Sequence, residues 1–310
     1  MATQSPEQKT LPSYPEPFIV SAREEHRQTL ILLHGRGGTG EQFGTSFIIS
    51  PISSCPGGGA SHSSQILATA LPNTKFIFPT ARKRHARWYD NGALLHQWFD
   101  GVPIDFQDAG MSPEQRDWQL EGLKESCAFL EGIVREEVER VGARNVFVGG
   151  LSQGCAMGLQ FLLSYEGELG GFVGMSGWLP YVDEMEGVLV EEEKGNDEDD
   201  SFARSGSEDR GTALKGEPAA MKICGFVRDN LDLPLPVTSR QPSWLQTPVY
   251  LGHGNIDEKV KLAKGRRAAE FLRGMGVQVV WKEYDEGHWY KVPEEIDDIV
   301  SFLRSYISLN

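Results

Sequence analysis

The sequence has few cysteines, and none of them lie close together. Only four occur in 310 residues, at positions 55, 127, 155 and 224, and no C-x-x-C motif is present. Disulfide frameworks and zinc sites of the usual spacing need more cysteines than this. We therefore predict reduced thiols, no metal site and a cytoplasmic location.

Long apolar runs are also missing. No run approaches the roughly 18 apolar residues of a membrane-spanning helix. Residues 1–17 contain four prolines and no apolar core of signal-peptide length, which predicts a flexible N-terminal arm. Residue 2 is alanine and no cysteine precedes Cys55, so this arm has no acceptor for N-terminal myristoylation or palmitoylation. We predict no stable membrane insertion.

Basic residues are outnumbered by acidic ones, 30 to 44, which gives a formal net charge of −14. A protein that binds the phosphates of nucleic acid needs a basic surface, so nucleic acid is not a predicted partner. Thirteen acidic and four basic residues fall within residues 183–220, and the rest of the chain is only mildly acidic. A stretch with this much charge and so few apolar residues is typical of disorder. We therefore predict a disordered acidic insertion over residues 183–220.

Apolar runs of strand length alternate with helical segments over residues 18–310. The predicted strands cover residues 17–20, 29–33, 75–78, 145–148, 170–175, 247–251 and 276–281. The predicted helices cover residues 113–141, 156–162, 258–275 and 294–307. Strands that are apolar throughout are typical of a parallel sheet buried on both faces. We predict one α/β domain with a mostly parallel central sheet and helices on both faces, and with the acidic insertion after the strand that ends near Met175.

The G-x-S-x-G motif at residues 150–154 is the strongest local signal for chemistry. It follows an apolar strand and opens a helix, which is the context of a nucleophile elbow. A sharp turn of this kind exposes the oxygen of Ser152 beside a helix N-terminus, where a developing anion is stabilised. The alternative is a glycine-rich turn with an exposed serine.

A serine nucleophile needs a base, and in sheets of this type the chain order is serine, acid, histidine. His253 and His288 are the only histidines after Ser152, and each follows a predicted strand. We predict that His288 is the base and that Asp257 orients it, with Asp285 as the competing carboxylate. His253 precedes any plausible acid, so we interpret it as structural.

The oxyanion of an acyl-transfer reaction also needs two N–H donors. We predict that they are the backbone groups of Gln153, after the nucleophile, and of Arg36, in the glycine-rich loop 34–40. That loop lacks the Lys and Ser/Thr of a phosphate-binding loop and the spacing of a dinucleotide fingerprint. We therefore predict no nucleotide and no other cofactor.

Six segments then follow one another along the chain: Leu33–Gly40, Gln97–Asp100, Gly149–Gly154, Ser176–Pro180, His253–Asp257 and Gly287–His288. In this order they resemble the acyl-protein thioesterases, which form the phospholipase/carboxylesterase group of α/β-hydrolases. The resemblance covers about residues 18–180 and 245–308. It implies the α/β-hydrolase fold, with Ser152, Asp257 and His288 at the positions of the family triad.

The resemblance also implies roles for the residues around that triad. Arg36 and Gln153 match the backbone oxyanion donors. Trp98 matches an aromatic residue near the acyl-binding side, with a core tryptophan as the alternative, and we also expect Trp178 and Trp289 to bind substrate. Trp289 stands where the family usually has serine, Gly38 where it often has aspartate, and Arg36 where it has an apolar residue. These differences alter the pocket wall, so they concern the substrate more than the reaction.

The stretch between Ser152 and Asp257 is longer than is usual in the family, and the excess falls at 183–246. This is a common position for a lid; a disordered surface insertion is the alternative. Residues 222–246 carry several apolar side chains that could pack near the site.

The sequence thus predicts a serine hydrolase that cleaves acyl thioesters or carboxylic esters through a seryl acyl-enzyme. Its substrate would be an acylated protein or a small acyl ester or thioester. The alternatives are a small-molecule carboxylesterase or lysophospholipase, and a non-catalytic binding module with the same fold. The sequence does not predict an oligomeric state.

Overall fold

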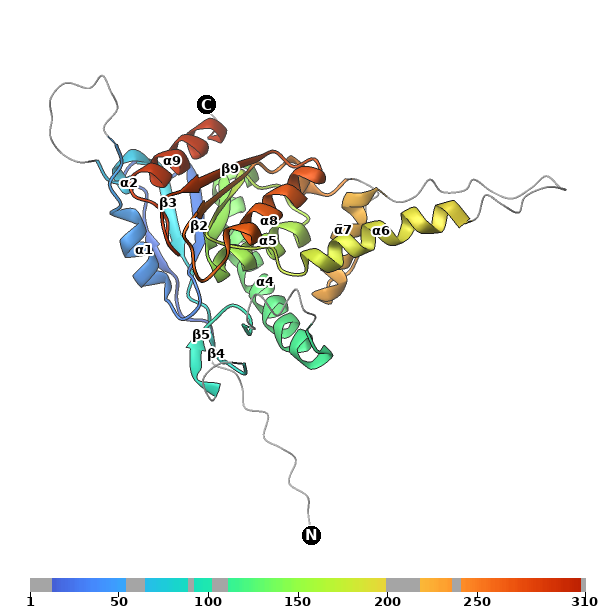
Figure 1. Cartoon of the computed structure of the whole chain (residues 1–310). Helices are drawn as coiled ribbons and strands as arrows, with labels where there is room; N and C mark the ends of the chain where they lie inside the picture. The colour runs from blue at the N-terminus through green and yellow to red at the C-terminus, as the bar shows by residue number, and fades with distance from the viewer. Residues whose placement is uncertain are drawn as a thin grey trace, which may run out of the picture.

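A seven-stranded sheet forms the centre of the described structure (Figure 1). The computed structural model describes residues 13–53, 65–88, 92–101, 111–198, 218–235 and 241–307, with the backbone alone for 191–198. The strand order is β1-β3-β2-β6-β7-β8-β9. The strands are β1 (Phe18–Val20), β2 (Gln28–Leu33), β3 (Thr74–Phe78), β6 (Val146–Leu151), β7 (Gly171–Met175), β8 (Val249–Gly254) and β9 (Val279–Tyr284).

The sheet is parallel except at one edge, where β1 pairs with β3 in the antiparallel direction. Every residue of β2, β6, β7 and β8 is buried, whereas the two edge strands β1 and β9 are partly exposed. This burial explains why the central strands are apolar rather than alternating. The predicted fold class, α/β with a mostly parallel sheet, is confirmed.

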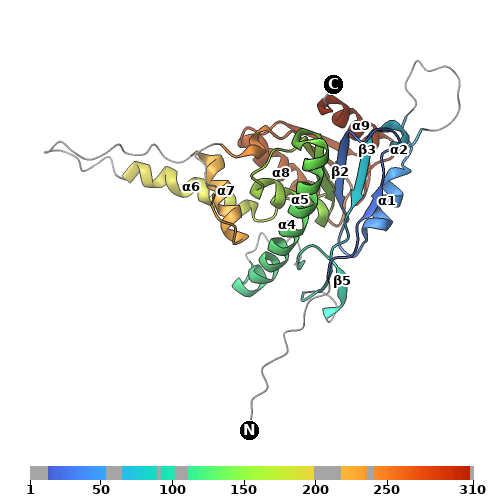
Figure 2. The same cartoon turned by 180° about the vertical axis from the view of Figure 1, so that it is seen from behind.

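Helices cover both faces of the sheet, and each face has its own core (Figures 1 and 2). On one face lie α1 (Gly40–Ile48), α2 (Leu67–Ala70) and α9 (Glu294–Tyr306), whose buried residues join one apolar cluster. On the other face, α4 (Pro113–Val141), α5 (Gln153–Ser164) and α8 (Leu262–Gly274) contribute to a second cluster. Because the central strands run parallel, their carboxyl ends meet at one edge of the sheet, where ligands bind in such folds.

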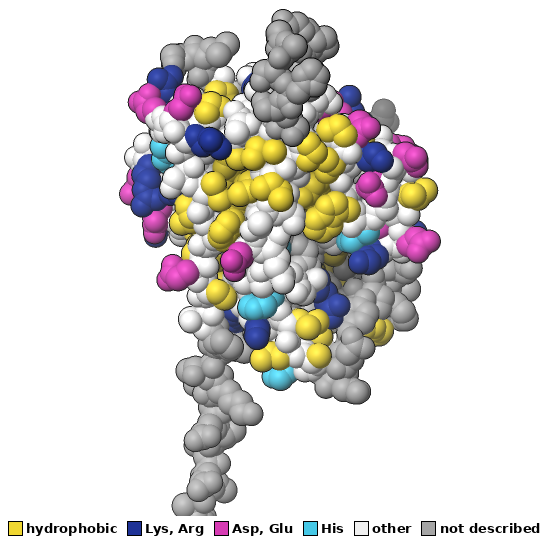
Figure 3. Space-filling view, turned by 90° about the vertical axis from the view of Figure 1, so that its left-hand side faces the viewer, with side chains coloured by type: hydrophobic (Ala, Val, Ile, Leu, Met, Phe, Trp, Pro, Cys, Tyr) yellow, Lys and Arg dark blue, Asp and Glu magenta, His cyan; other side chains and the backbone are white. Residues whose placement is uncertain are grey.

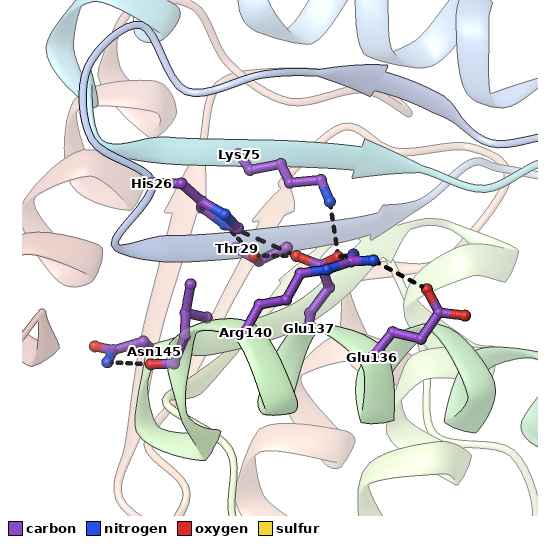
Figure 4. Close-up of polar contacts among 8 residues, drawn as sticks. His26, Thr29, Lys75, Glu136, Glu137, Arg140 and Asn145 are labelled. Atoms are coloured by element: carbon purple, nitrogen blue, oxygen red, sulfur yellow. Dashed lines mark hydrogen bonds and ion pairs between the residues drawn. The ribbon is translucent and has the colours of Figure 1, made fainter.

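The long helix α4 is fixed at both ends. Ser112 caps its N-terminus in a capping box with Gln115. Near its C-terminus, Glu137 is buried against the sheet and accepts hydrogen bonds from Thr29 Oγ1 at 2.8 Å and from Lys75 Nζ at 2.7 Å (Figure 4). Arg140 also binds Glu137. These contacts tie the helix to β2 and β3.

The acidic stretch is more ordered than the sequence predicts. Helix α6 (Val182–Glu198) occupies its first part and α7 (Ala219–Asn230) begins near its end, while residues 199–217 lie outside the described residues. Met185 is fully buried, and Arg267 of α8 binds Asp183 and Glu186 at 2.5 Å each. Glutamate also favours helix formation. Beyond this anchored turn, α6 extends away from the body in both views (Figures 1 and 2).

Within residues 222–246, the described parts 222–235 and 241–246 contribute apolar side chains to the core rather than to the site, contrary to the expectation that they could pack near it. Ile223, Val227 and Leu231 join the cluster under α5, and the 3-10 turn Ser243–Gln246 buries Trp244. A short two-stranded sheet of β4 (Lys83–His85) and β5 (Leu94–His96) was not predicted. Residues 1–12 of the predicted arm lie outside the described residues.

None of the helices in the described part of the chain combines the length and the apolar character needed to cross a membrane.

Candidate active site

Ser152 lies at the turn between β6 and α5, in a backbone conformation that few non-glycine residues adopt. Its φ is +56° and its ψ is −120°. Such a conformation costs about 1–3 kcal/mol and persists only where the surrounding structure enforces it. Gly154 enforces it here, because a Cβ at this position would lie 2.1 Å from the carbonyl oxygen of Leu33. A Cβ at Gly150 would lie 2.6 Å from the same oxygen, so both motif glycines are needed for packing.

The structure brings Ser152, His288 and Asp257 together from three strand ends. Nε2 of His288 lies 2.8 Å from Oγ of Ser152, and Nδ1 lies 2.7 Å from Oδ2 of Asp257. With Nδ1 bearing the proton, His288 donates to the carboxylate and can accept the serine proton at Nε2. Both distances are within the range required for general-base activation of a nucleophile. The competing carboxylate, Asp285, is exposed on the loop that carries His288.

Asp257 is buried yet well supplied with donors. Its Oδ1 accepts the backbone N–H groups of Lys259 at 2.8 Å and Val260 at 2.9 Å. Burial alone would raise the pKa of Asp257, but hydrogen bonds from His253 and His288 and the Val260 N–H together hold this pKa below its ordinary value. The group therefore stays an anion opposite the imidazole, which is what an orienting acid needs.

His253 is part of the support for Asp257. It is fully buried, and its Nε2 lies 2.9 Å from the carbonyl oxygen of Val260 and 3.4 Å from Oδ2 of Asp257. This position is in keeping with the structural interpretation from the sequence. The spacing of His253 and Asp257 gave no signal for this contact, because the i, i+4 rule holds for helices and these residues lie in β8 and in the loop after it.

The glycine-rich loop packs directly against the nucleophile. A Cβ at Gly35 would lie 3.4 Å from Cβ of Ser152, so the loop backbone passes beside the serine. The N–H groups of Gly37 and Gly38 are donated to the carbonyls of His96 and Gly35, at 2.8 and 3.1 Å. The first N–H groups of α5, beginning with Gln153, have no helical acceptor four residues earlier. The loop and the helix N-terminus thus face the serine from two sides.

His34 holds this loop from inside. Its Nε2 accepts the N–H of Ala81 at 3.0 Å, so Nδ1 carries the proton and donates to the carbonyl oxygen of Gly35 at 2.7 Å. Burial lowers the pKa of His34 to about 4, so the ring is neutral near pH 7. His34 stands in the glycine-rich motif, but its position there gives no sign of this supporting role.

Trp98 is a packing residue of the site rather than part of its wall, so the expectation that it binds substrate is not met. It is fully buried, does not line the pocket, and donates its indole N–H to the carbonyl oxygen of His34 at 2.8 Å. The side chain of Gln153 accepts the backbone N–H of Trp98 at 3.1 Å and donates to the carbonyl oxygen of Phe99 at 2.9 Å. The core alternative raised for this tryptophan is the observed one.

A pocket of about 670 Å³ opens over Ser152. Trp178 and Trp289 line it, together with Arg36, Phe43 and other residues of the loop and α1, so their expected role in binding substrate stays a prediction. Trp289 is 42% exposed and meets Phe43 edge to face, with ring centroids 6.4 Å apart. This volume and these aromatic walls suit an apolar acyl group.

Apolar side chains also gather outside the pocket. Figure 3 shows them grouped on the side of the molecule where α1 lies in Figure 1. Ile49, directly after α1, is 56% exposed.

A metal centre would need at least three clustered ligands. Among the described residues, no group of three or more His, Cys, Asp or Glu side chains could hold a metal ion.

Comparison with known proteins shows which proteins this chain is similar to. The phospholipase/carboxylesterase family model matches residues 55–193. The chain is 29% identical over 301 residues to acyl-protein thioesterase 1 of Yarrowia lipolytica, covering 96% of this chain and 99% of the relative. It is 25% identical over 292 residues to acyl-protein thioesterase 1 of Gibberella zeae, covering 94% and 95%.

A further relative and a solved structure extend the comparison. Carboxylesterase SOBER1 of Arabidopsis thaliana is 29% identical over 220 residues, covering 71% of this chain and 72% of the relative. The crystal structure of Zea mays acyl-protein thioesterase 2 has a TM-score of 0.57 and 23% identity, covering 95% of this chain and all of that one. The solved structure shares the fold, and the chain is similar to the acyl-protein thioesterases over most of its length and to the phospholipase/carboxylesterase family over residues 55–193.

Proposed function

We propose that this chain is a serine hydrolase that cleaves acyl thioesters or carboxylic esters through a seryl acyl-enzyme. One observation carries the proposal: the continuous hydrogen-bonded chain from Ser152 Oγ through His288 to Asp257. The strained turn at Ser152 and the pocket above it support the same conclusion.

In the first half of the reaction, His288 Nε2 takes the proton from Ser152 as Oγ bonds to the acyl carbonyl carbon. The tetrahedral intermediate collapses when the bond to the leaving sulfur or oxygen breaks. His288 returns the proton to that atom, so a thiol or an alcohol departs and the acyl group stays on Ser152. Asp257 stabilises the imidazolium that exists between the two proton transfers.

In the second half, water replaces the leaving group. His288 takes one proton from water as the water oxygen bonds to the acyl carbon. It then gives that proton to Oγ of Ser152 when the ester bond breaks. A carboxylic acid departs and Ser152 is regenerated. We assign the two oxyanion donors to the backbone N–H groups of Arg36 and Gln153, because the loop and the first turn of α5 flank the serine.

The substrate class follows from the relatives. Thioesterase relatives cover nearly the whole chain, which favours an acylated protein whose thiol is the leaving group. The carboxylesterase relative favours a small acyl ester as the second candidate. No cofactor enters the proposed cycle, and we expect it to run in the cytoplasm.

A fluorophosphonate probe tests the enzyme proposal. The wild type is expected to be labelled at Ser152, whereas Ser152→Ala is expected to lose labelling and to lose hydrolysis by about 10³-fold or more. Ser301→Ala, at an exposed serine of α9, is the matched control and should label normally. A wild type that is folded but not labelled would overturn the proposal in favour of a binding module.

Parallel assays separate the two substrate candidates. A long-chain acyl thioester and a short nitrophenyl ester are compared by kcat/KM. A higher value for the thioester supports the thioesterase, and a higher value for the short ester supports the carboxylesterase.

A further inference from the structure

The buried acid at the start of α9 contacts the loop that carries His288. Residues 285–293 connect β9 to α9, and we call them the histidine loop. Glu295, in the first turn of α9, is 1% exposed. Its Oε2 accepts the backbone N–H of Lys291 at 2.9 Å, and its own N–H is donated to the carbonyl of Lys291 at 3.0 Å. Glu295 therefore binds both the N–H and the carbonyl of Lys291, three residues after the proposed catalytic base.

We propose that Glu295 is a positioning residue that holds the histidine loop, and with it His288, against the carboxyl end of β8. The proposal rests on the hydrolase function proposed above. It adds a residue that touches neither the nucleophile nor the pocket.

The other end of the loop is already fixed to β8. The N–H of Ile256 is donated to the carbonyl of Glu286 at 3.2 Å, next to the turn that carries Asp257. In the middle, Ser176 Oγ donates to the carbonyl of Trp289 at 3.2 Å. Lys291 is thus a second attachment point after His288, beyond the contact at Trp289. Without it, the part of the loop that follows the imidazole would lose one of these two hydrogen-bonded contacts.

The carboxyl group of Glu295 also packs against the strand itself. A Cβ at Gly252 of β8 would lie 2.1 Å from Oε1 of Glu295, so only glycine leaves room for this carboxyl group. Gly252 in turn accepts the N–H of Ser176 through its carbonyl at 2.9 Å. Glu295 therefore lies between the strand that leads to Asp257 and the loop that carries His288.

The surroundings of Glu295 favour its neutral form. Oε1 has no hydrogen-bond partner among the described residues. The pKa of Glu295 is raised to about 8, mainly by burial and also by the negative charges of Asp298 and Glu286, while the hydrogen bond from the Lys291 N–H acts in the opposite direction. The hydroxyls of Tyr250 and Tyr284 lie on the same side of the sheet and bind each other at 2.6 Å. An ionised carboxylate here would be a buried charge with a single N–H donor, which is costly.

Loss of the proton from Glu295 should therefore weaken the contacts that place His288. A misplacement of about 1 Å in a catalytic group can cost about 100-fold in rate. Because the folded-state pKa is raised, this support is complete in the neutral form and is lost as the pH rises through about 8. The wild type should lose kcat above that pH.

Three variants test the proposal, each assayed per active site titrated with the fluorophosphonate probe. Glu295→Ala is expected to lower kcat by about ten- to a hundredfold with KM changed less than about threefold. Glu295→Gln, a neutral isostere, is expected to keep kcat near the wild-type value at pH 7 and to remove the alkaline decline. Glu294→Ala, at the exposed neighbouring position, is the matched control and should behave as the wild type.

The outcomes are separable. An unchanged kcat in Glu295→Ala, or an alkaline decline in Glu295→Gln identical to that of the wild type, overturns the positioning role. If Glu295→Ala does not fold, the pH profile of Glu295→Gln decides the question. A wild type that is not labelled by the probe defeats the hydrolase proposal instead, before any variant is compared.

Discussion

At the scale of single residues, Asp257 is better suited than Asp285 to orient His288, because hydrogen-bond donors surround its carboxylate. Asp257 is buried and bonded to His288, whereas Asp285 is exposed. Asp257→Asn should lower kcat by about 10³- to 10⁴-fold, because an amide can donate to Nδ1 and so favour the wrong imidazole tautomer. Asp285→Asn should leave kcat within about twofold. Steady-state kinetics on both variants checks this, and an equal loss in both would contradict it.

The site residues that could be predicted from the sequence are those that occur along the chain in the order typical of this catalytic chemistry. Ser152 stood in a motif, and His288 and Asp257 followed in the order that this fold imposes. Trp98 was misjudged because sequence does not reveal whether an aromatic side chain faces a pocket or the core. Glu295 gave no signal, because an acidic residue in the first turn of a helix is common and usually exposed.

At the scale of elements, Glu137 joins α4 to the sheet through a buried ion pair with Lys75. Glu137→Gln should reduce the free energy of unfolding by about 2–4 kcal/mol, since Lys75 would be left partly buried without its anion. Glu136→Gln, one residue earlier in the same helix, removes an exposed pair with Arg140 and should change the free energy of unfolding by less than about 0.5 kcal/mol. Urea unfolding of both variants measures the difference.

The ion pair between Glu137 and Lys75 should also make the stability of the protein depend on pH, in a direction that the pKa of Glu137 determines. Burial would raise the pKa of Glu137, but hydrogen bonds from Lys75 and Thr29 hold it below its ordinary value. A lowered pKa means that the contribution is present above the pKa of the unfolded chain and is lost as the pH falls. The difference in the free energy of unfolding between wild type and Glu137→Gln should therefore become smaller as the pH falls. A difference that stays constant with pH would count against the ion pair.

The elements that sequence predicts well are those with a strong internal pattern. The buried strands and α4 show this, since apolar runs and a capped periodic segment leave little choice. Helix α6 was missed because its anchors lie elsewhere in the chain, on Arg267 of α8 and Arg116 of α4. The short hairpin of β4 and β5 was missed because three-residue strands carry too little pattern.

At the scale of the whole molecule, the excess negative charge and the pocket are separate. No acidic side chain is among the residues that line the pocket within the described part of the chain. The anchored turn of α6 ends near Glu186, well before the run of acids that begins at residue 191. The charge that dominates the composition therefore belongs to a segment whose described anchors are independent of the pocket.

Removing residues 191–217 and joining 190 to 218 through a short glycine-serine linker should consequently leave hydrolysis intact. Met185 and the ion pairs of Arg267 remain to fix the start of α6, and α7 keeps its packing against α5. We expect kcat/KM for a small acyl ester within about twofold of the wild type, because no described pocket contact is lost. A matched variant that keeps the length but replaces the acids of this segment with glutamine separates charge from chain length. A large fall in kcat/KM in the deletion, with the glutamine variant unaffected, would mean that the segment acts as a lid.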